Sequence, residues 1–319
     1  MAKFRFGIMG TGNIANKFAE AVALIDDCEI VAVANRHVER AQAFAEKFQI
    51  SVYGDDFEAL VTDQELDAVY IATTTNMHYQ LTKLCIKHHV AVICEKAMFM
   101  NSDEAIDALD EAEAKKVFVM EAMWSRFLPV YRQVLNWLAD GKIGQLTLSN
   151  YDIGFLAQDD PTNRFFDPEL GGGATYDLLV YSFELSTLLM GNDYSNTDVA
   201  TIWRHGVDAT DHVTLHYANS LATMSASFLA RLSGELVVYG NQGKVVIPNA
   251  NGATEARLYD RHDKLVEHYQ DTETTNGFVY QIKEVMSCVR DGALQSVLVP
   301  HDLTIAGARL YDQIWRNKR

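Results

Sequence analysis

Up to Glu121, short apolar runs alternate with longer segments of helical periodicity. In Val38–Phe48 and Ser102–Ala114 the apolar residues recur every three or four positions, which places them on one face of a helix. A series of strands that each lead into such a helix is typical of βαβ units and predicts a parallel sheet. The expected strands are Phe4–Met9, Glu29–Ala34, Ser51–Tyr53, Ala68–Ala72, Ala91–Cys94 and Val117–Met120.

After Glu121 the pattern changes to one of alternating strands. Helices are expected at Pro129–Asp140, Ala174–Met190, Phe278–Arg290 and Leu303–Trp315. Turn sequences at Ala218-Asn219-Ser220 and Asn241-Gln242-Gly243 connect neighbouring strands as hairpins, so the sheet should be open and mainly antiparallel. Its strands are expected at Leu146–Ile153, Ala200–Arg204, His212–Tyr217, Ala222–Leu229, Glu235–Tyr239, Lys244–Ile247, Ala256–Asp260 and Leu265–His268.

These elements predict an α/β protein of two domains. Residues 1–122 should form a Rossmann domain with a doubly wound parallel sheet. Residues 123–299 should form an α+β domain for substrate binding and dimerisation, and the last helix, within 300–319, is expected to pack back on the first domain. Helices cover one face of the second sheet only, which favours a homodimer through the open face.

Composition excludes several classes of protein. The chain has 319 residues, 48% of them hydrophobic, which is enough for a sizeable core, and its formal net charge of −16 disfavours nucleic acids and anionic membranes as partners. No run approaches the roughly 18 apolar residues of a membrane span, and the N-terminus lacks the pattern of a signal peptide. Cys28, Cys85, Cys94 and Cys288 are far apart, so neither a disulfide framework nor a metal site is indicated. A cytoplasmic location is expected.

The first strand leads into a glycine-rich turn with a GxGxxA spacing. Gly10 permits the tight turn, Gly12 lets a pyrophosphate approach the backbone, and Ala15 lets the following helix, Ile14–Leu24, pack closely. The N–H groups and the positive end of the helix dipole favour an anion. An ordinary strand-to-helix turn is the alternative, but the strand before and the helix after the motif favour a dinucleotide.

The end of the second strand indicates which dinucleotide. Asn35 and Arg36 follow it, and no acidic residue lies between Ile30 and Val38 to hold the adenosine ribose hydroxyls. Because an arginine at this place accommodates a 2′-phosphate, NADP(H) is the expected cofactor and NAD remains possible. The alternative is that Arg36 is a solvated surface residue.

Polar residues also follow the fourth and fifth expected strands, at the edge of a parallel sheet where ligands bind. Thr73 and Thr74 can line the cofactor and Asn76 can cap the next helix, whereas His78, one turn into that helix, is interpreted as structural. Glu95 and Lys96 end the following strand. A lysine there can hydrogen-bond a substrate oxygen and lower the pKa of a neighbouring acid, although a surface ion pair is the alternative.

Three glycines, Gly171 to Gly173, precede the long helix of the second part. Asp177 and Tyr181 are four residues apart on this helix and therefore share one face. A phenol ionises near pH 10, but a nearby ammonium such as that of Lys96 would make Tyr181 a workable general acid and base. The alternative is a core tyrosine and a surface aspartate.

Taken in order, these motifs resemble the glucose-fructose oxidoreductase / inositol dehydrogenase / MocA (Gfo/Idh/MocA) family. Within it, the branch of dimeric dihydrodiol dehydrogenase and NADP-dependent D-xylose 1-dehydrogenase is the most similar. The resemblance covers essentially the whole chain. It is carried by the GxGxxA turn, Glu95-Lys96, the run EAMWSRF from Glu121, the run GGGATYDLLVY from Gly171 and the run YGNQGK from Tyr239.

The resemblance implies hydride transfer between NADP(H) and a carbon that bears a hydroxyl, in a sugar, cyclic polyol or dihydrodiol. Lys96 and Tyr181 would act at the reacting oxygen, and Asp177 would orient the substrate or Lys96. Ala97 and Thr74 replace prolines common in the family, which leaves the local geometry open. The residues expected around the cofactor are Gly10, Thr11, Gly12, Asn13, Ile14, Asn35, Arg36, Thr73, Thr74, Asn76, His78, Glu95, Lys96, Trp124 and Arg126.

Two other functions remain open. The first is an NAD-linked inositol or sugar dehydrogenase, which Arg36 disfavours. The second is a regulator that senses the dinucleotide without catalysis, as one branch of the family does. A sensor has no need to keep Lys96 and Tyr181, so their presence favours an enzyme.

Overall fold

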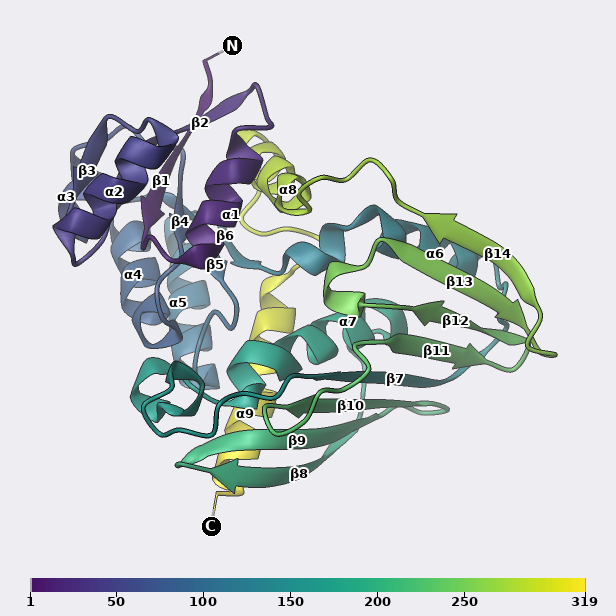
Figure 1. Ribbon diagram of the computed structural model, residues 1–319. Helices are drawn as coiled ribbons and strands as arrows, with labels where there is room; N and C mark the ends of the chain where they lie inside the picture. The colour runs from purple at the N-terminus through teal and green to yellow at the C-terminus, as the bar shows by residue number, and fades with distance from the viewer. Residues whose placement is uncertain (1, 319) are drawn as a thin grey trace. The chain divides into compact units, whose positions relative to one another are not determined.

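The computed structural model describes residues 2–318, and its contacts divide the chain into two compact units (Figure 1). The first unit contains the residues up to Trp124 together with Asn276–Ala308, and the second contains Ser125–Thr275 together with the chain from Arg309 on. The range 123–299 expected for the second domain thus includes a helix, α8 (Phe278–Arg290), that belongs to the first unit. Residues of the last helix, α9 (His301–Arg316), belong to both units.

A six-stranded parallel sheet forms the centre of the first unit. The strand order is β3-β2-β1-β4-β5-β6. Strands β2 and β3 extend the sheet on one side of β1 and strands β4 to β6 extend it on the other, so the predicted doubly wound Rossmann sheet is confirmed. The strands are β1 (Phe4–Met9), β2 (Cys28–Ala34), β3 (Val52–Gly54), β4 (Ala68–Ile71), β5 (Ala91–Glu95) and β6 (Val119–Ala122). The helices between them are α1 (Asn13–Val22), α2 (Val38–Phe48), α3 (Phe57–Thr62), α4 (Thr75–Lys87) and α5 (Ser102–Lys115).

The predicted periodicity corresponds to the buried faces of these helices. In α2 the buried residues are Ala41, Phe44 and Ala45, which are three and four positions apart as the sequence indicates. In the core, the ring of Phe18 from α1 stacks on that of Tyr70 from β4, with 3.8 Å between the ring centres. Burial of one apolar face on the sheet therefore holds each helix in place.

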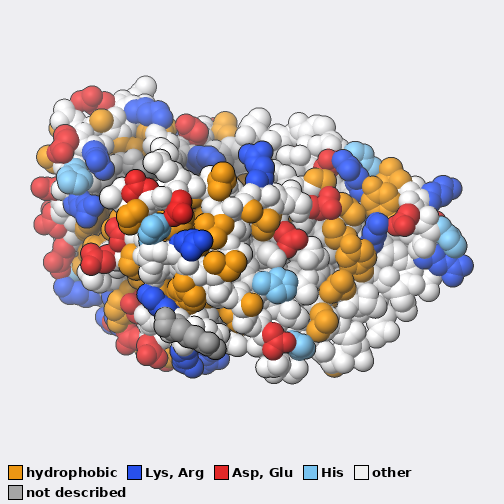
Figure 2. Space-filling model, turned by 60° about the horizontal axis from the view of Figure 1, so that its bottom comes forward, with side chains coloured by type: hydrophobic (Ala, Val, Ile, Leu, Met, Phe, Trp, Pro, Cys, Tyr) orange, Lys and Arg blue, Asp and Glu red, His pale blue; other side chains and the backbone are white. Residues whose placement is uncertain are grey.

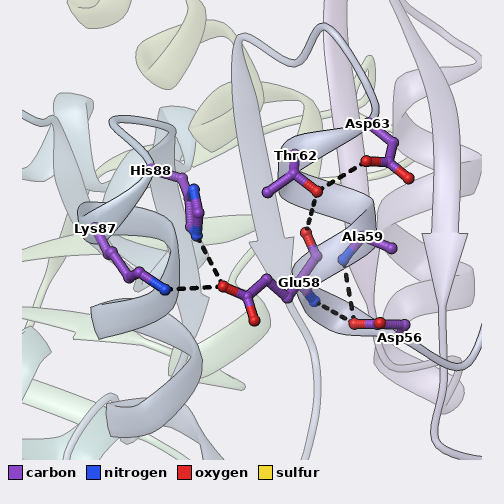
Figure 3. A network of polar contacts seen from close by, with 7 residues as sticks. All are labelled: Asp56, Glu58, Ala59, Thr62, Asp63, Lys87 and His88. Atoms are coloured by element: carbon purple, nitrogen blue, oxygen red, sulfur yellow. Dashed lines mark hydrogen bonds and ion pairs between the residues drawn. The ribbon is translucent and has the colours of Figure 1, made fainter.

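Polar contacts at the surface join α3 to the end of α4 (Figure 3). The Asp56 side chain caps α3 by accepting hydrogen bonds from the N–H groups of Glu58 and Ala59, at 2.8 and 3.1 Å. The Glu58 carboxylate then accepts from Lys87 Nζ at 2.8 Å and lies 3.2 Å from His88 Nε2. Glu58 is exposed, so this network contributes little to stability.

The second unit is built on an eight-stranded sheet of order β14-β13-β12-β11-β7-β10-β9-β8. Every neighbouring pair is antiparallel except β7 and β10, which are parallel, so the prediction of an open, mainly antiparallel sheet is confirmed. The strands are β7 (Leu146–Gly154), β8 (Asn196–Arg204), β9 (Val207–His216), β10 (Leu221–Ser227), β11 (Leu236–Gly240), β12 (Gly243–Ile247), β13 (Glu255–Asp260) and β14 (Leu265–Gln270).

Helices pack on one face of this sheet. Helix α6 (Pro129–Ala139) contacts β13 and β14, and α7 (Val180–Met190) contacts β7 and β10. The long helix predicted over Ala174–Met190 is in fact a π-helix, η4 (Thr175–Leu179), followed by α7, because the Val180 N–H reaches back five residues to the Thr175 carbonyl. Short 3-10 helices complete the chain: η1 (Trp124–Phe127), η2 (Arg164–Phe166), η3 (Pro168–Leu170) and η5 (Ala250–Gly252).

Three further observations concern the function classes considered above. Among residues 2–318, no helix is both long and apolar enough to cross a membrane. Within the same residues, no group of three or more His, Cys, Asp or Glu side chains is arranged to hold a metal ion. The four cysteines are free, and Cys28, Cys85 and Cys94 are buried.

Candidate active site

The glycine-rich turn between β1 and α1 has the geometry that a pyrophosphate requires. Gly10 has a φ of +97°, and a Cβ there would lie 2.5 Å from the Ala72 carbonyl oxygen, so a side chain is excluded. Gly12 is the N-cap of α1 and supplies no side-chain cap, and apart from its own backbone and its chain neighbours, no atom of the described residues lies within 4 Å of the place a Cβ would take. The open backbone at the positive end of the helix dipole therefore fits a phosphate group.

The turn after β2 is tied to the glycine-rich turn. Asn35 donates a hydrogen bond from Nδ2 to Thr11 Oγ1 at 2.8 Å and accepts one from the His37 N–H at 2.9 Å. Arg36 lies between these two anchored residues, and its side chain is exposed. Its guanidinium therefore extends from a well-held backbone and is accessible to a phosphate on a bound nucleotide.

The end of β4 differs from the prediction in one respect. Helix α4 begins at Thr75 with Thr74 as the N-cap, so the expected capping by Asn76 is wrong. Asn76 lies inside the first turn, where its side-chain oxygen accepts a hydrogen bond from Thr74 Oγ1 at 2.7 Å. The hydroxyl of Thr73 donates to the Thr74 carbonyl at 3.4 Å.

His78 is buried between two loops of the first unit. Its Nδ1 lies 3.0 Å from the carbonyl oxygen of Ala97, and its Nε2 lies 3.3 Å from that of Thr73. Burial lowers the pKa of the imidazole to about 4, so the ring is neutral and carries one N–H for these two acceptors. The residue joins the loop after β4 to the loop after β5, as a structural histidine would.

Lys96 follows β5 in a segment that buried side chains hold from several sides. Glu95, 5% exposed, accepts a hydrogen bond from the Tyr70 hydroxyl at 2.5 Å, which excludes the alternative of a surface ion pair for this residue. Burial raises the pKa of the Glu95 carboxyl to about 7, although Tyr70 and the Lys96 charge act in the opposite direction. The Lys96–Ala97 peptide bond is cis.

Glu121, at the end of β6, is a further anchor of this segment that the sequence analysis did not single out. One of its carboxylate oxygens accepts a hydrogen bond from the Met98 N–H at 2.9 Å, and the other accepts from Thr304 Oγ1 of α9 at 3.0 Å. Together, His78 and Glu121 hold the backbone on the carboxyl side of Lys96. The only sequence signal for this role is a carboxylate at the end of an otherwise apolar strand.

Asp177 and Tyr181 belong to the second unit. Asp177 lies in the π-helix η4, and its side chain is 28% exposed and 3.9 Å from Arg164 Nη2. Tyr181 lies in the first turn of α7, is 8% exposed and interacts electrostatically with the buried Tyr151 of β7. A π-turn inside a helix is uncommon and often occurs at functional sites, so its presence favours a functional role for the segment that contains Asp177 and Tyr181.

Trp124 and Arg126, both expected near the cofactor, belong to different compact units. Trp124 stacks on Phe278 of α8 with 5.3 Å between the ring centres. Arg126 is 7% exposed and donates from Nη1 to the Glu184 carbonyl at 2.5 Å and to Glu184 Oε2 at 3.1 Å. The structure thus places Arg126 in a buried ion pair with α7, a partnership that no local sequence pattern indicates.

Known families match this chain in two consecutive regions. Residues 4–123 match the family described as "Oxidoreductase family, NAD-binding Rossmann fold", and residues 131–246 match the "GFO/IDH/MocA C-terminal domain". The first region contains the strands of the parallel sheet, β1 to β6, and the second contains β7 to β11 and most of β12 of the eight-stranded sheet. The expected two-part organisation of the family is therefore present in this chain.

Relatives of known name cover nearly the whole chain. The trans-1,2-dihydrobenzene-1,2-diol dehydrogenase of Mus musculus is 31% identical over 93% of this chain and 91% of its own length. The protein of the same name from Xenopus laevis is 28% identical over 92% of each chain. Among solved structures, the aldose-aldose oxidoreductase of Caulobacter crescentus, complexed with glycerol, has the same fold, with a TM-score of 0.89 at 19% identity over 98% of this chain and 97% of that one.

These matches agree with the motifs and with the geometry of the glycine-rich turn. The resemblance to the dihydrodiol dehydrogenase branch is confirmed by the relatives that carry that name. The chain belongs to the GFO/IDH/MocA family of oxidoreductases, and it is an enzyme of that family with an NAD(P)-binding Rossmann fold.

Proposed function

We propose that the protein transfers a hydride between NADP(H) and the CH–OH carbon of a sugar, cyclic polyol or dihydrodiol. The observation that carries the proposal is the anchoring of Lys96. Its backbone follows β5 of an NAD(P)-binding fold, and buried contacts to His78 and Glu121 hold the two residues that come after it. A lysine on a loosely held surface loop would not need this support. The dihydrodiol dehydrogenases named above supply the substrate class.

The proposal assigns some residues to cofactor binding and others to the reacting oxygen. The turn Gly10–Ile14 binds the pyrophosphate, with Asn35 and Arg36 on the adenosine side and Thr73, Thr74 and Trp124 along the rest of the cofactor. The bound nicotinamide supplies the hydride acceptor or donor. Lys96 donates a hydrogen bond to the reacting oxygen, and its positive charge stabilises negative charge that develops there.

Tyr181 acts as the general acid and base of the reaction. In the direction of oxidation its phenolate accepts the proton of the substrate hydroxyl, and in reduction the phenol returns it. A phenol needs a lowered pKa for this role, and the ammonium of Lys96 would supply that effect. Asp177, which is partly exposed and close to Arg164, orients the substrate or Lys96.

A substrate screen tests the proposal. The protein is mixed with NADP+ or NADPH and with panels of dihydrodiols, cyclic polyols, pentoses and hexoses, or the corresponding carbonyl compounds, and the nicotinamide absorbance is followed. Turnover of at least one panel supports the proposal. Tight NADP(H) binding without any turnover would instead favour the alternative of a cofactor-sensing regulator.

Replacing Arg36 by aspartate should reverse the cofactor preference. Loss of a charge-assisted hydrogen bond costs about 1.5–3 kcal/mol, so the Kd for NADP should rise by about 10- to 100-fold, while the new carboxylate can accept the ribose hydroxyls of NAD. Titration calorimetry with both dinucleotides measures the effect. Arg132→Asp, an exposed position on α6, makes the same change of charge and should leave the preference unaltered.

An unchanged preference in Arg36→Asp would remove Arg36 from the phosphate site. If the parent protein already binds NAD more tightly than NADP, NAD replaces NADP as the proposed cofactor. The alternative of an NAD-linked sugar or inositol dehydrogenase is then favoured. Titration of the parent protein therefore comes first.

We also propose that the protein forms a homodimer through the open face of the eight-stranded sheet. Cross-strand pairing aligns six side chains in one row on this face: Leu221, Leu148, Tyr239, Lys244, Tyr259 and Leu265. Leu221 is 38% and Leu265 48% exposed, and exposed apolar side chains also occur on the face drawn in Figure 2 (orange). A mostly apolar row across six strands favours burial against a second copy.

Sedimentation analysis tests the dimer. The parent protein should sediment as a dimer, and Leu221→Asp should shift it towards the monomer because a buried carboxylate would be unpaired at the interface. Leu24→Asp, at an exposed apolar position in the first unit, is the matched control and should stay dimeric. A monomeric parent protein would contradict this proposal.

A further inference from the structure

A pair of aspartates, Asp208 and Asp211, is buried in the second unit. Both side chains are 0% exposed, and both lie on β9. Residues three apart on a regular strand point to opposite faces of the sheet. Here the pairing with β8 shifts, so that Thr201 faces Asp211 and Trp203 faces Asp208, with Ala209 as the extra residue of a β-bulge. The bulge turns both carboxyls to the same face.

The two carboxyls reach the start of the helix that carries Asp177 and Tyr181. Asp208 Oδ2 accepts a hydrogen bond from the Thr175 N–H at 2.6 Å, and Asp211 Oδ2 accepts one from Thr175 Oγ1 at 3.1 Å. Asp211 Oδ1 accepts from Thr201 Oγ1 at 2.8 Å. Thr175 is the first residue of the π-helix η4, and this pair holds its N–H and its hydroxyl.

The remaining oxygen, Asp208 Oδ1, meets no donor among the described residues. It lies against Gly173, where a Cβ would come within 2.2 Å of it, and the φ of +124° at this glycine is one that other residues rarely adopt. An ionised carboxylate with a buried, unpaired oxygen beside a second carboxylate is costly. One proton held between Asp208 and Asp211 removes the repulsion and converts their contact into a hydrogen bond.

Among residues 2–318, the cation beside this part of β9 is Lys318, whose ammonium donates to the Gly206 carbonyl at 2.6 Å and lies over the Trp203 ring. The side chains directed to the pair are Thr201 and Trp203 from β8, Ala226 from β10 and Thr175 from η4. None of the interactions that dominate the ionisation of either carboxyl comes from a Lys, Arg or His among residues 2–318. Burial, together with the second carboxyl, holds the pKa of Asp208 well above its usual range, and burial also raises the pKa of Asp211.

We propose that Asp208 and Asp211 share one proton and that this singly protonated pair positions Thr175, and with it the helix segment that presents Asp177 and Tyr181. The inference rests on the proposed function, since it assigns the pair a role in that reaction. Asp208 and Asp211 are positioning residues because they act through Thr175. The orientation of catalytic groups is sensitive, and a displacement of about 1 Å can cost 10²-fold in rate.

Substitutions of Asp208 separate the shared proton from the simple presence of a side chain. In Asp208→Asn the amide oxygen still accepts from the Thr175 N–H, and the NH2 group donates to Asp211 without a titratable proton. Most of kcat should therefore be retained. In Asp208→Ala both contacts are lost, and kcat should fall by about 10²-fold with the Kd for NADP unchanged. Asp140→Asn, an exposed position in the same unit, is the control.

Hydrogen exchange adds a readout that does not depend on turnover. The Thr175 amide should exchange at least about tenfold faster in Asp208→Ala than in the parent protein, because its acceptor is gone. In Asp208→Asn it should remain protected. Parent-like kcat and protection in Asp208→Ala would overturn the positioning role. If Asp208→Ala does not fold, Asp211→Asn takes its place. Its single amide oxygen cannot accept from both Thr175 Oγ1 and Thr201 Oγ1, so its kcat should fall below that of Asp208→Asn, and a parent-like kcat would overturn the positioning role.

The pH dependence of unfolding tests the shared proton itself. The folded protein binds a proton that the unfolded chain releases above the ordinary pKa of Asp, so the contribution of the pair to stability is complete below that pKa and is lost as pH rises through the folded pKa. The Tm of Asp208→Asn should therefore decline less with rising pH than that of the parent protein. Parallel curves would overturn the shared proton. If the parent protein turns over no substrate, the proposed function fails, whereas the exchange and Tm comparisons still decide on the pair.

Discussion

Replacing Lys96 by methionine should lower kcat by about 10²- to 10⁴-fold, the range for loss of a group that stabilises charge or transfers protons at the reacting oxygen. Methionine keeps an unbranched side chain of similar shape as far as Cε and lacks the ammonium. The Kd for NADP should change by about tenfold or less, since one hydrogen bond contributes about 1 kcal/mol. Steady-state kinetics with the best substrate of the screen and calorimetry with NADP measure the two quantities.

The physical basis of this expectation is the way the Lys96 segment is held. His78 and Glu121 bind the backbone at Ala97 and Met98, so methionine can enter without a change in the loop. A loss of activity in Lys96→Met would then report the missing charge and not a displaced backbone. Lys87→Met, at an exposed position at the end of α4, removes a lysine elsewhere in the same unit and should keep the parent kcat. Full turnover in Lys96→Met would remove Lys96 from the mechanism.

Replacing Arg126 by methionine should lower the free energy of unfolding by about 3–5 kcal/mol, because the buried Glu184 carboxylate would lose the guanidinium that pairs with it. The two side chains are 7% and 2% exposed, so solvent cannot replace the lost partner. Urea unfolding followed by circular dichroism measures the change. The double variant Arg126→Met with Glu184→Met removes both charges and should regain much of the stability.

The same variant decides between two roles for Arg126. The family resemblance implies a place around the cofactor, whereas the structure places its guanidinium against Glu184. If Arg126→Met is as stable as the parent protein but binds NADP weakly, the cofactor role is the correct one. Loss of stability with an unchanged Kd for NADP assigns Arg126 to the ion pair.

Local patterns were sufficient to predict most elements of the fold. The bounds of α2 and α8 agree with the ranges Val38–Phe48 and Phe278–Arg290, because an amphipathic face is recorded in consecutive residues. The glycine-rich turn was predicted for a similar reason, since a backbone with φ of +97° at Gly10 requires a particular residue type. In each case the physical cause and the sequence signal lie within a few residues of each other.

The features that sequence did not predict depend on distant partners. The ion pair of Arg126 with Glu184 joins residues 58 positions apart. The β-bulge at Ala209 is visible only in the register of β9 against β8, and strand β9 begins well before the predicted His212. The capping role of Asn76 was wrong because Thr74, two residues earlier, takes the N-cap position. Periodicity within one segment contains no information about such pairings.

The parallel pairing of β7 with β10 has a consequence for how the second unit assembles. Hairpins connect β8, β9 and β10 on one side, and β11 to β14 on the other, and each of these groups can form from local contacts. Strand β7 lies between them, and its pairing with β10 must close a chain segment from Gly154 to Leu221. Contacts of such sequence separation form slowly. The two groups of hairpin-connected strands should therefore form first. Strand β7, although it is synthesised before them, should pair last and join them into one sheet.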